Sequence, residues 1–434
     1  MTAPEARRVV SRVEVLALSL NDVVGSGVYL LPAAAAAALA GSASLWGVAL
    51  AGLAVLLIVL CFAEAASRFD EPGGAYVYAR EAWGDLAGFE VGWMTFLTRV
   101  ATLASLSAGF AQALSWAWPA AAGGAGRAAA IALPLIVLTA INVKGVKEGA
   151  RASAFLLVAK LVPLALFVGA GLFAVRWSRV AAPARVDPAG LGEVALLLLF
   201  AYAGFENTAA PAGEYRNPKR DVPFALVTQI VLVTLIYALV QLVALGTLPD
   251  LAASRTPLAD AARLFLGGWG GALLTAGAAA SILGTAGNTV LSGPRYLYAL
   301  AVDGYGPAFL GRLHPRFLTP AAAIVVQTAV VLPLALTGSF AGLAALSVVA
   351  RLASYVSTAA AIPVLRRKLP DTPATVRLPF GPAIPVAAVA VSAFLVASAT
   401  ALDLVAGAGA LVAGLVVYAL RRKGAAGDGG AAGV

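Results

Sequence analysis

The stretch LNDVVGSGVYLLP, Leu20–Pro32, decides the fold, because it interrupts the first apolar segment long enough to cross a membrane. It places an acid, two glycines and a serine where an uninterrupted apolar helix is expected. An unpaired backbone amide or carbonyl in hydrocarbon costs several kcal/mol, so non-helical backbone occurs there only where protein buries it or where it lines a polar cavity. The stretch therefore predicts a broken helix that faces an internal cavity.

The composition around this stretch is that of a membrane protein. Of the 434 residues, 61% are hydrophobic and 12% are charged, whereas soluble domains are about 45–50% apolar and about 25% charged. A helix needs roughly 20 apolar residues to span a bilayer. We place twelve such spans at residues 13–39, 43–67, 84–118, 128–146, 152–175, 192–214, 223–248, 267–302, 319–337, 340–364, 381–401 and 403–420.

The basic residues predict the orientation of these spans. The net charge is +9, and 21 of the 30 lysines and arginines fall in loops that would share a side with the N-terminus. Cytoplasmic loops carry the excess of basic residues, so both termini are expected in the cytoplasm of a protein in the inner (plasma) membrane. The charges do not cluster on a soluble face, so the lipid bilayer is the expected partner and nucleic acid is not.

A second interruption suggests an internal repeat. The sequence AYAGFEN, Ala201–Asn207, breaks the sixth span, five spans after the first break. An odd offset inserts the second copy upside down, which is the inverted-repeat arrangement of many secondary transporters. The expected parts are an N-terminal tail (1–12), a first repeat (13–175), a second repeat (192–364), two further spans (381–420) and a C-terminal tail (421–434).

The chemistry of the two breaks suits a ligand that carries both charges. Gly25 and Gly27 lack side chains, so a ligand can approach the backbone closely. A half-helix that begins near Val28 would direct free amides toward a carboxylate, while the carbonyls near Val24 and Ala201 would suit an ammonium group. The alternative is that Gly25, Ser26 and Gly27 form a small-residue patch for close helix packing.

Charged residues inside predicted spans are the other candidates. A charge near the membrane centre costs at least about 2.5 kcal/mol on insertion scales, so it marks a functional site by default. Lys160 lies in the middle of the fifth span, and a buried lysine changes its protonation state readily, so it is the predicted proton carrier. Its alternative role is a snorkelling or structural counter-ion. Arg99 and Arg351 could each line a pathway or form a gate ion pair.

Three motifs in this order resemble the amino acid–polyamine–organocation permeases, over nearly the whole chain. They are GSGVYLLP in the first span, FAYAGFENTAAPAGEYRNPKRDVPFAL in the sixth span and its loop, and NTVLSGPRYLYALAVDGYGP at the end of the eighth. The resemblance implies an all-α, LeuT-like fold of about twelve transmembrane helices. In this fold, two inverted five-helix repeats with broken helices 1 and 6 precede two C-terminal helices.

The resemblance also implies roles for individual positions. The backbone of Ser26, Gly27 and Val28 resembles the family's carboxylate cradle, and the ammonium cradle corresponds to carbonyls around Val24, Phe200, Ala201 and Ala203. Phe200 matches an aromatic residue that closes over bound substrate. Lys160 matches a lysine whose ammonium takes the place of the sodium ion of sodium-dependent relatives, which favours H⁺ as the coupling ion. Glu206 matches a glutamate that is structural or proton-linked.

The pocket walls favour a neutral amino acid as substrate. Thr98, Thr102 and Asn288 are uncharged, and Arg99 would repel a second cation. The expected function is therefore proton-coupled uptake of a neutral amino acid by alternating access. Alternatives are an exchanger or exporter of amino acids or amines, and a nutrient receptor on a transporter fold. An enzyme, a metal site and a cofactor are not expected, because the chain has one cysteine, Cys61, and one histidine, His314.

Overall fold

The computed structural model describes residues 10–71, 73–115, 118–144, 146–181, 185–186, 191–210, 212, 215–372 and 374–428. Residues 1–9 of the predicted N-terminal tail and 429–434 of the predicted C-terminal tail lie outside the described residues. Helices make up the described architecture, apart from two short strands, β1 (Leu39–Ala40) and β2 (Arg185–Val186). These strands pair antiparallel, with Leu39 opposite Val186.

The first predicted span is a broken helix, as the sequence predicts. It consists of α1 (Arg12–Val23) and α2 (Gly27–Ala38), which are bent by 46° at residues 24–26. The rest of the first half is helical at each predicted span. Its elements are α3 (Ala43–Ala66), α4 (Ala75–Trp83), α5 (Asp85–Leu114), η1 (Pro119–Ala122), α6 (Gly124–Lys144), α7 (Val146–Ala174) and α8 (Trp177–Val180).

The sixth predicted span is interrupted as well. Helix α9 (Leu191–Tyr202) ends at Tyr202, and a 3-10 turn, η2 (Phe205–Ala209), follows. The remaining elements are α10 (Pro218–Thr247), η4 (Leu251–Ala253), α11 (Pro257–Leu266), α12 (Gly268–Val302), α13 (Ala321–Thr337), α14 (Phe340–Lys368), α15 (Ala383–Ala397) and α16 (Ala401–Asp428). Helix α16 continues past residue 420, where the last span was predicted to end.

The described helices support a multi-pass membrane protein. Seven of them are long and apolar enough to cross a bilayer, or eight spans if the bent α1–α2 pair counts as one. Helices α13 and α15 are apolar but shorter than 18 residues. Large apolar side chains such as Phe173, Leu402 and Phe155 are 95%, 78% and 73% exposed. Such exposure is expected of side chains that face lipid.

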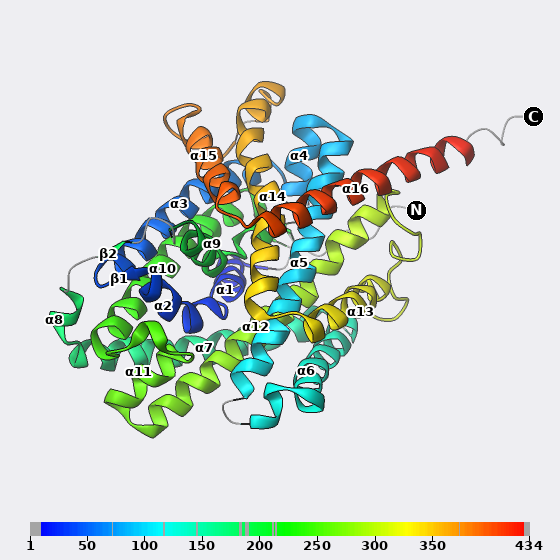
Figure 1. The fold of residues 1–434 in the computed structure, drawn as a ribbon. Coiled ribbons are helices and arrows are strands. Elements are labelled where there is room, and N and C mark those ends of the chain that lie inside the picture. The colour runs from blue at the N-terminus through cyan, green and yellow to red at the C-terminus, as the bar shows by residue number, and fades with distance from the viewer. Residues whose placement is uncertain are drawn as a thin grey trace, which may run out of the picture.

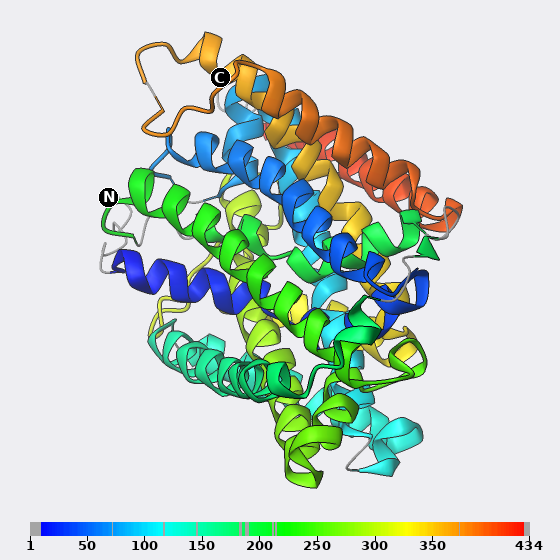
Figure 2. The ribbon, with the colours of Figure 1, turned by 90° about the vertical axis from the view of Figure 1, so that its left-hand side faces the viewer.

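The broken helices lie inside the bundle. In Figure 1, α1 and α9 lie near the centre, α2 runs from there toward β1, and α5, α12 and α14 lie in front of or beside them. Helices α15 and α16 run along the outside, which Figure 2 shows from the side. This arrangement places both breaks where protein surrounds them, so their unpaired backbone groups are shielded from lipid.

Loops that were predicted to share a side of the membrane contact one another. Three ion pairs join loops or adjoining helix ends predicted on one side, on the face that carries Arg12, the N-terminal face. They are Arg12–Asp221 at 2.9 Å, Lys219–Asp70 at 3.1 Å and Arg80–Asp303 at 3.6 Å. On the opposite face, Arg127 donates to the carbonyl of Leu336 at 2.5 Å, and Arg179 donates to that of Thr247 at 2.7 Å.

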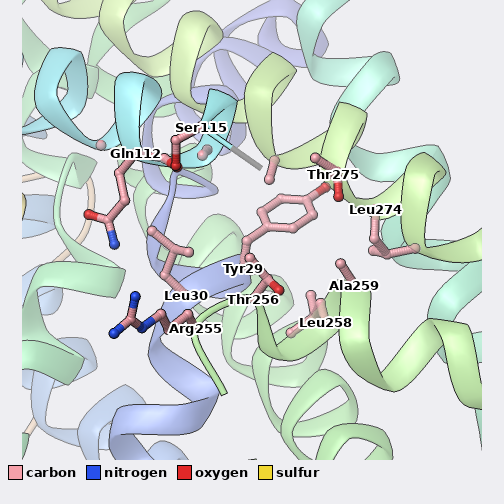
Figure 3. Close-up of a pocket in the computed structure, with 13 residues that line it drawn as sticks. Tyr29, Leu30, Gln112, Ser115, Arg255, Thr256, Leu258, Ala259, Leu274 and Thr275 are labelled. Carbon is pink, nitrogen blue, oxygen red and sulfur yellow. The ribbon is translucent and has the colours of Figure 1, made fainter. Parts of the chain in front are cut away.

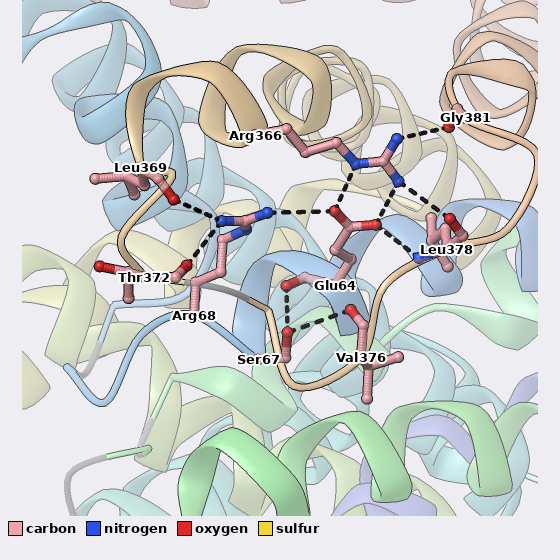
Figure 4. A network of polar contacts seen from close by, with 9 residues as sticks. All are labelled: Glu64, Ser67, Arg68, Arg366, Leu369, Thr372, Val376, Leu378 and Gly381. Carbon is pink, nitrogen blue, oxygen red and sulfur yellow. Dashed lines mark hydrogen bonds and ion pairs between the residues drawn. The ribbon is translucent and has the colours of Figure 1, made fainter.

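A buried carboxylate anchors the connection between α14 and α15 on the N-terminal face. Glu64, at the end of α3, is fully buried and accepts two hydrogen bonds from Arg366, at 2.8 and 2.7 Å. The backbone amide of Leu378 donates to the same carboxylate at 2.9 Å. Arg68 lies 3.6 Å from Glu64 and donates to the carbonyl of Thr372 at 2.9 Å (Figure 4). Glu64 therefore joins the end of α3 to the end of α14 and to the loop that follows it.

Candidate functional site

The two breaks touch each other. A Cβ atom placed on Gly27 would lie 2.8 Å from both Cα and Cβ of Ala201. A Cβ on Gly204, whose φ is +121°, would lie 2.8 Å from the carbonyl oxygen of Asp22. Glycine at both positions allows this approach, because any side chain would force the two segments apart.

The carbonyls at the end of α1 bind a buried lysine. Lys160, on α7, is fully buried, and its Nζ lies 2.6 Å from the carbonyl oxygen of Asn21 and 2.5 Å from that of Val24. Ser281, on α12, donates to the carbonyl of Gly25 at 2.9 Å. A cation is favourable at the C-terminal end of a helix, where unpaired carbonyls concentrate negative partial charge. Lys160 supplies that cation at the break.

A tyrosine joins the two breaks. The hydroxyl of Tyr237, on α10, lies 3.1 Å from the carbonyl oxygen of Val23 and 2.9 Å from that of Ala201. The carbonyl of Val24 also accepts from Ser281 at 3.1 Å. The single Ser281 hydroxyl hydrogen is shared between this carbonyl and that of Gly25, so Lys160 is the main donor to the Val24 carbonyl, which was predicted to hold a substrate ammonium. In this conformation, Val24 binds protein donors at that position.

An acid on α1 binds the second break. The side-chain amide of Asn207 donates to Asp22 Oδ2. Asp22 Oδ1 is buried and has no hydrogen-bond partner in the described part of the chain. The carboxylate therefore links the first and sixth spans with one oxygen and keeps the other unused.

Glu206 holds two buried arginines together. Its Oε1 lies 2.5 Å from Arg99 Nη2 and 3.2 Å from Arg351 Nε. Its Oε2 accepts from the backbone amide of Gly204 at 3.0 Å and from the hydroxyl of Tyr355 at 3.1 Å. Glu206, Arg99 and Arg351 are 3%, 1% and 2% exposed. This ion pair network ties α5 and α14 to the second break.

A narrow central cavity lies between these groups. Its volume is about 20 Å³, which is close to the space that one water molecule needs. Seven of the predicted site residues line it: Gly25, Ser26, Gly27, Thr102, Phe200, Ala201 and Ala203. The remaining lining residues are Asp22, Val23, Arg99, Leu106, Gly204, Thr285 and Arg351.

Four predicted substrate residues do not line this cavity: Val24, Val28, Thr98 and Asn288. Thr98 is buried and donates to the carbonyl of Met94 in its own helix, at 2.9 Å. The predicted proton-coupling residues are Lys160, which binds the first break, and Glu206, which binds the second. Neither residue lines the central cavity. Sequence reasoning did not name Thr285, although it lies one turn from Asn288 in a segment rich in small and hydroxyl residues.

A larger pocket opens toward the opposite face of the bundle. It has a volume of about 250 Å³ and lies between α2, α5, α12 and the start of α11. Tyr29, Gln112 and Arg255 surround it (Figure 3). The hydroxyl of Tyr29 donates to the backbone carbonyl of Lys160 at 2.8 Å. Tyr29 therefore connects the wall of this opposite-face pocket to the helix that carries the buried lysine.

Comparison with known proteins identifies the family. The sequence model of the family described as amino acid permease matches residues 10–417. The chain belongs to this family. The match includes both breaks, Lys160 and the Glu206 network, so all of the geometry described above lies within the permease region.

Several relatives of this permease are named as transporters. The serine/threonine exchanger SteT of Bacillus subtilis is 29% identical over 93% of this chain and 94% of its own. The branched-chain amino acid permease BcaP of the same organism is 27% identical over 93% of this chain and 90% of its own. An uncharacterized transporter of Mycobacterium tuberculosis is 32% identical over 78% of this chain and 76% of its own. The methylthioribose transporter of B. subtilis is 28% identical over 87% of this chain and 86% of its own. Not all relatives are therefore named for amino acids.

Proposed function

We propose that this permease carries an amino acid into the cell by alternating access and that a proton moves with it. The observation that carries the proposal is the bond between the Lys160 ammonium and the carbonyls of Asn21 and Val24 at the break. This arrangement puts a titratable cation in contact with the backbone that borders the central cavity. A change in its protonation would alter the break directly.

The fold proposed for this function is the LeuT-like arrangement of twelve spans. Helices occur at every predicted span, and two of these spans are broken five spans apart. The contacts between loops of one side support this topology, with the N-terminal face in the cytoplasm. The proposed setting is the inner (plasma) membrane, with both termini in the cytoplasm.

The two faces of the protein differ, which supports alternating access. Ion pairs close the N-terminal face, while the opposite-face pocket reaches Tyr29, just beyond the first break. In alternating access, a site between the repeats opens to one side at a time. We assign the conformation described here to a state with its wider opening away from the N-terminal face.

Lys160 is proposed to fill the role of a coupling cation. Its ammonium already occupies carbonyls of the kind that bind a metal cation at an unwound helix. We propose H⁺ as the coupling ion, with neither a metal nor an organic cofactor. The substrate side chain is proposed to carry no positive charge, because Arg99 and Arg351 line the central cavity.

The second candidate is exchange of one amino acid for another, with Lys160 acting only as a structural cation. The relation to SteT, which is named as a serine/threonine exchanger and is 29% identical, favours it. An exporter would use the same site in the reverse direction. A receptor without flux would bind the same ligand and transport nothing.

Purified permease in liposomes separates these functions. Accumulation of a labelled amino acid that depends on an inward proton gradient supports proton symport. Counterflow that is independent of the gradient supports exchange, and binding without flux supports a receptor. If no amino acid in a full panel binds or is transported, the proposed function is wrong.

A further inference from the structure

Two buried guanidinium groups share one carboxylate beside the central cavity. Arg99 and Arg351 both line the cavity, and both are paired with the same oxygen of Glu206. The other oxygen of Glu206 already accepts two hydrogen bonds, from the Gly204 amide and the Tyr355 hydroxyl. The carboxylate is therefore fully used, and Glu206 by itself balances only one of the two guanidinium charges.

The same two arginines retain unused donors. Arg99 Nε and Arg351 Nη1 are buried, and neither has an acceptor among the residues that the structure describes. Arg351 is oriented by a hydrogen bond from Nη2 to Thr102 Oγ1, at 3.2 Å. A buried donor on a cation without an acceptor is costly, and truncating one partner of a buried charge pair costs more. A ligand that brings acceptor oxygens to these donors would remove that cost.

The count of charges around the breaks points to the charge of the ligand. When Lys160 is protonated and Asp22 is ionised, Arg99, Arg351 and Lys160 contribute three positive charges, and Asp22 and Glu206 contribute two negative ones. All five side chains are at least nine-tenths buried. A zwitterion leaves the excess of one positive charge in place, whereas a ligand with net charge −1 removes it. Unbalanced buried charge is strongly unfavourable, so a ligand with net charge −1 is preferred over a zwitterion.

We propose that the permease selects an amino acid that carries a second carboxylate. That carboxylate accepts from Arg99 and Arg351, the free Oδ1 of Asp22 accepts from the substrate ammonium, and Ser26 contacts the remaining carboxylate. Ser26 Oγ is buried and without a partner in the described chain, and it lies in the same cavity. The inference rests on the proposed function, and it replaces the neutral side chain that the sequence favoured.

Isosteric substrate pairs test this assignment on the unaltered protein. Uptake of labelled L-glutamate, L-glutamine, L-aspartate and L-asparagine would be measured separately in liposomes. At low concentration, the initial rate of uptake of each acid is expected to exceed that of its amide by about tenfold or more. The reason is that the coupling energy of a close buried charge pair commonly exceeds the free energy that corresponds to a tenfold change in affinity. Equal or faster uptake of the amides would overturn the inference and leave amino acid transport standing. Transport of none of the amino acids in the panel would instead reject the proposed function.

Variants of one arginine sharpen the test. Arg351→Gln is expected to lower the ratio of glutamate to glutamine uptake by about tenfold, while Arg351→Lys, which keeps the charge, lowers it less. The ratio is measured within each preparation, so a smaller amount of folded protein does not imitate the effect. Arg312→Gln, at an exposed loop position, serves as the control. If Arg351→Gln does not fold, the ratio of acid to amide uptake by the unaltered protein decides, and equal rates reject the assignment.

Discussion

Lys160 Nζ lies 2.5 Å from the carbonyl oxygen of Val24, the residue that directly follows the last turn of α1. The same ammonium lies 2.6 Å from the carbonyl of Asn21. One side chain from α7 thus donates to two carbonyls at the end of α1. In the proposed function, protonation of this group would therefore act directly on the first span.

Replacing this lysine tests both of its roles. Lys160→Met removes the donors and keeps an unbranched side chain, so we expect a loss of about 1–3 kcal/mol in unfolding free energy, because two buried carbonyls lose a donor. Lys160→Arg keeps donors but cannot be deprotonated, so proton-driven accumulation should stop. Melting curves and uptake in liposomes measure the two effects. Undiminished gradient-driven uptake by Lys160→Met would show that the proton travels elsewhere.

Gly27→Ala should abolish transport. The new methyl group would lie 2.8 Å from two atoms of Ala201, which is closer than non-bonded carbon atoms come. The two breaks must then separate, and the cavity between them must change shape. Gly409→Ala on α16 is the matched control, because nothing lies within 4 Å of its added methyl group. The control should retain uptake and gain about 0.5–1 kcal/mol from the better helix former. Similar uptake by both variants would contradict the close contact.

Glu206→Gln should be much more destabilising than Tyr355→Phe. The first variant leaves Arg99 and Arg351 buried without a carboxylate, which costs about 3–5 kcal/mol. The second removes one neutral donor to Glu206 Oε2 and costs about 1 kcal/mol. Denaturation of both proteins in the same detergent measures the difference. Equal losses would mean that the carboxylate does not carry the network.

Glu64→Gln should loosen the connection between α14 and α15. Arg366 and Arg68 would lose their shared counter-charge, and the amide of Leu378 would lose a charged acceptor. We expect faster proteolytic cleavage between residues 369 and 382 and a lower melting temperature. Glu71→Gln is the control, since Glu71 is 67% exposed and pairs with Arg80 at 3.5 Å. Exposed pairs contribute at most about 1 kcal/mol, so a comparable effect in the control would argue against a buried anchor.

The breaks could be predicted from local sequence, because their cause is local. Glycine, serine and acid residues in the middle of an apolar run are visible without any tertiary information, as in Val24–Gly27. Lys160 is visible for the same reason, since a charge stands out in an apolar helix. Positive charge on one set of loops gave a topology with which the observed loop contacts agree.

The partners of these groups could not be predicted, because they come together only in the folded chain. Arg99, Glu206 and Arg351 lie on three distant segments, and no local pattern links them. Without their proximity, the cavity walls seemed neutral apart from Arg99. On α5, Thr98 and Thr102 were equally plausible, yet only Thr102 lines the cavity. A helix turns by about 100° per residue, so the choice between such positions needs the orientation of the helix.

The contact between Gly27 and Ala201 has a mechanical consequence. With no side chain between them, the two interrupted spans are in direct contact here, and the Tyr237 hydroxyl lies within hydrogen-bond distance of one carbonyl from each span. A tilt of α2 or of α9 would then move the other helix as well, because the two meet at this contact. Under the proposed alternating access, this linkage would make opening toward one compartment close the path from the other, which would preserve the ion gradient across the membrane.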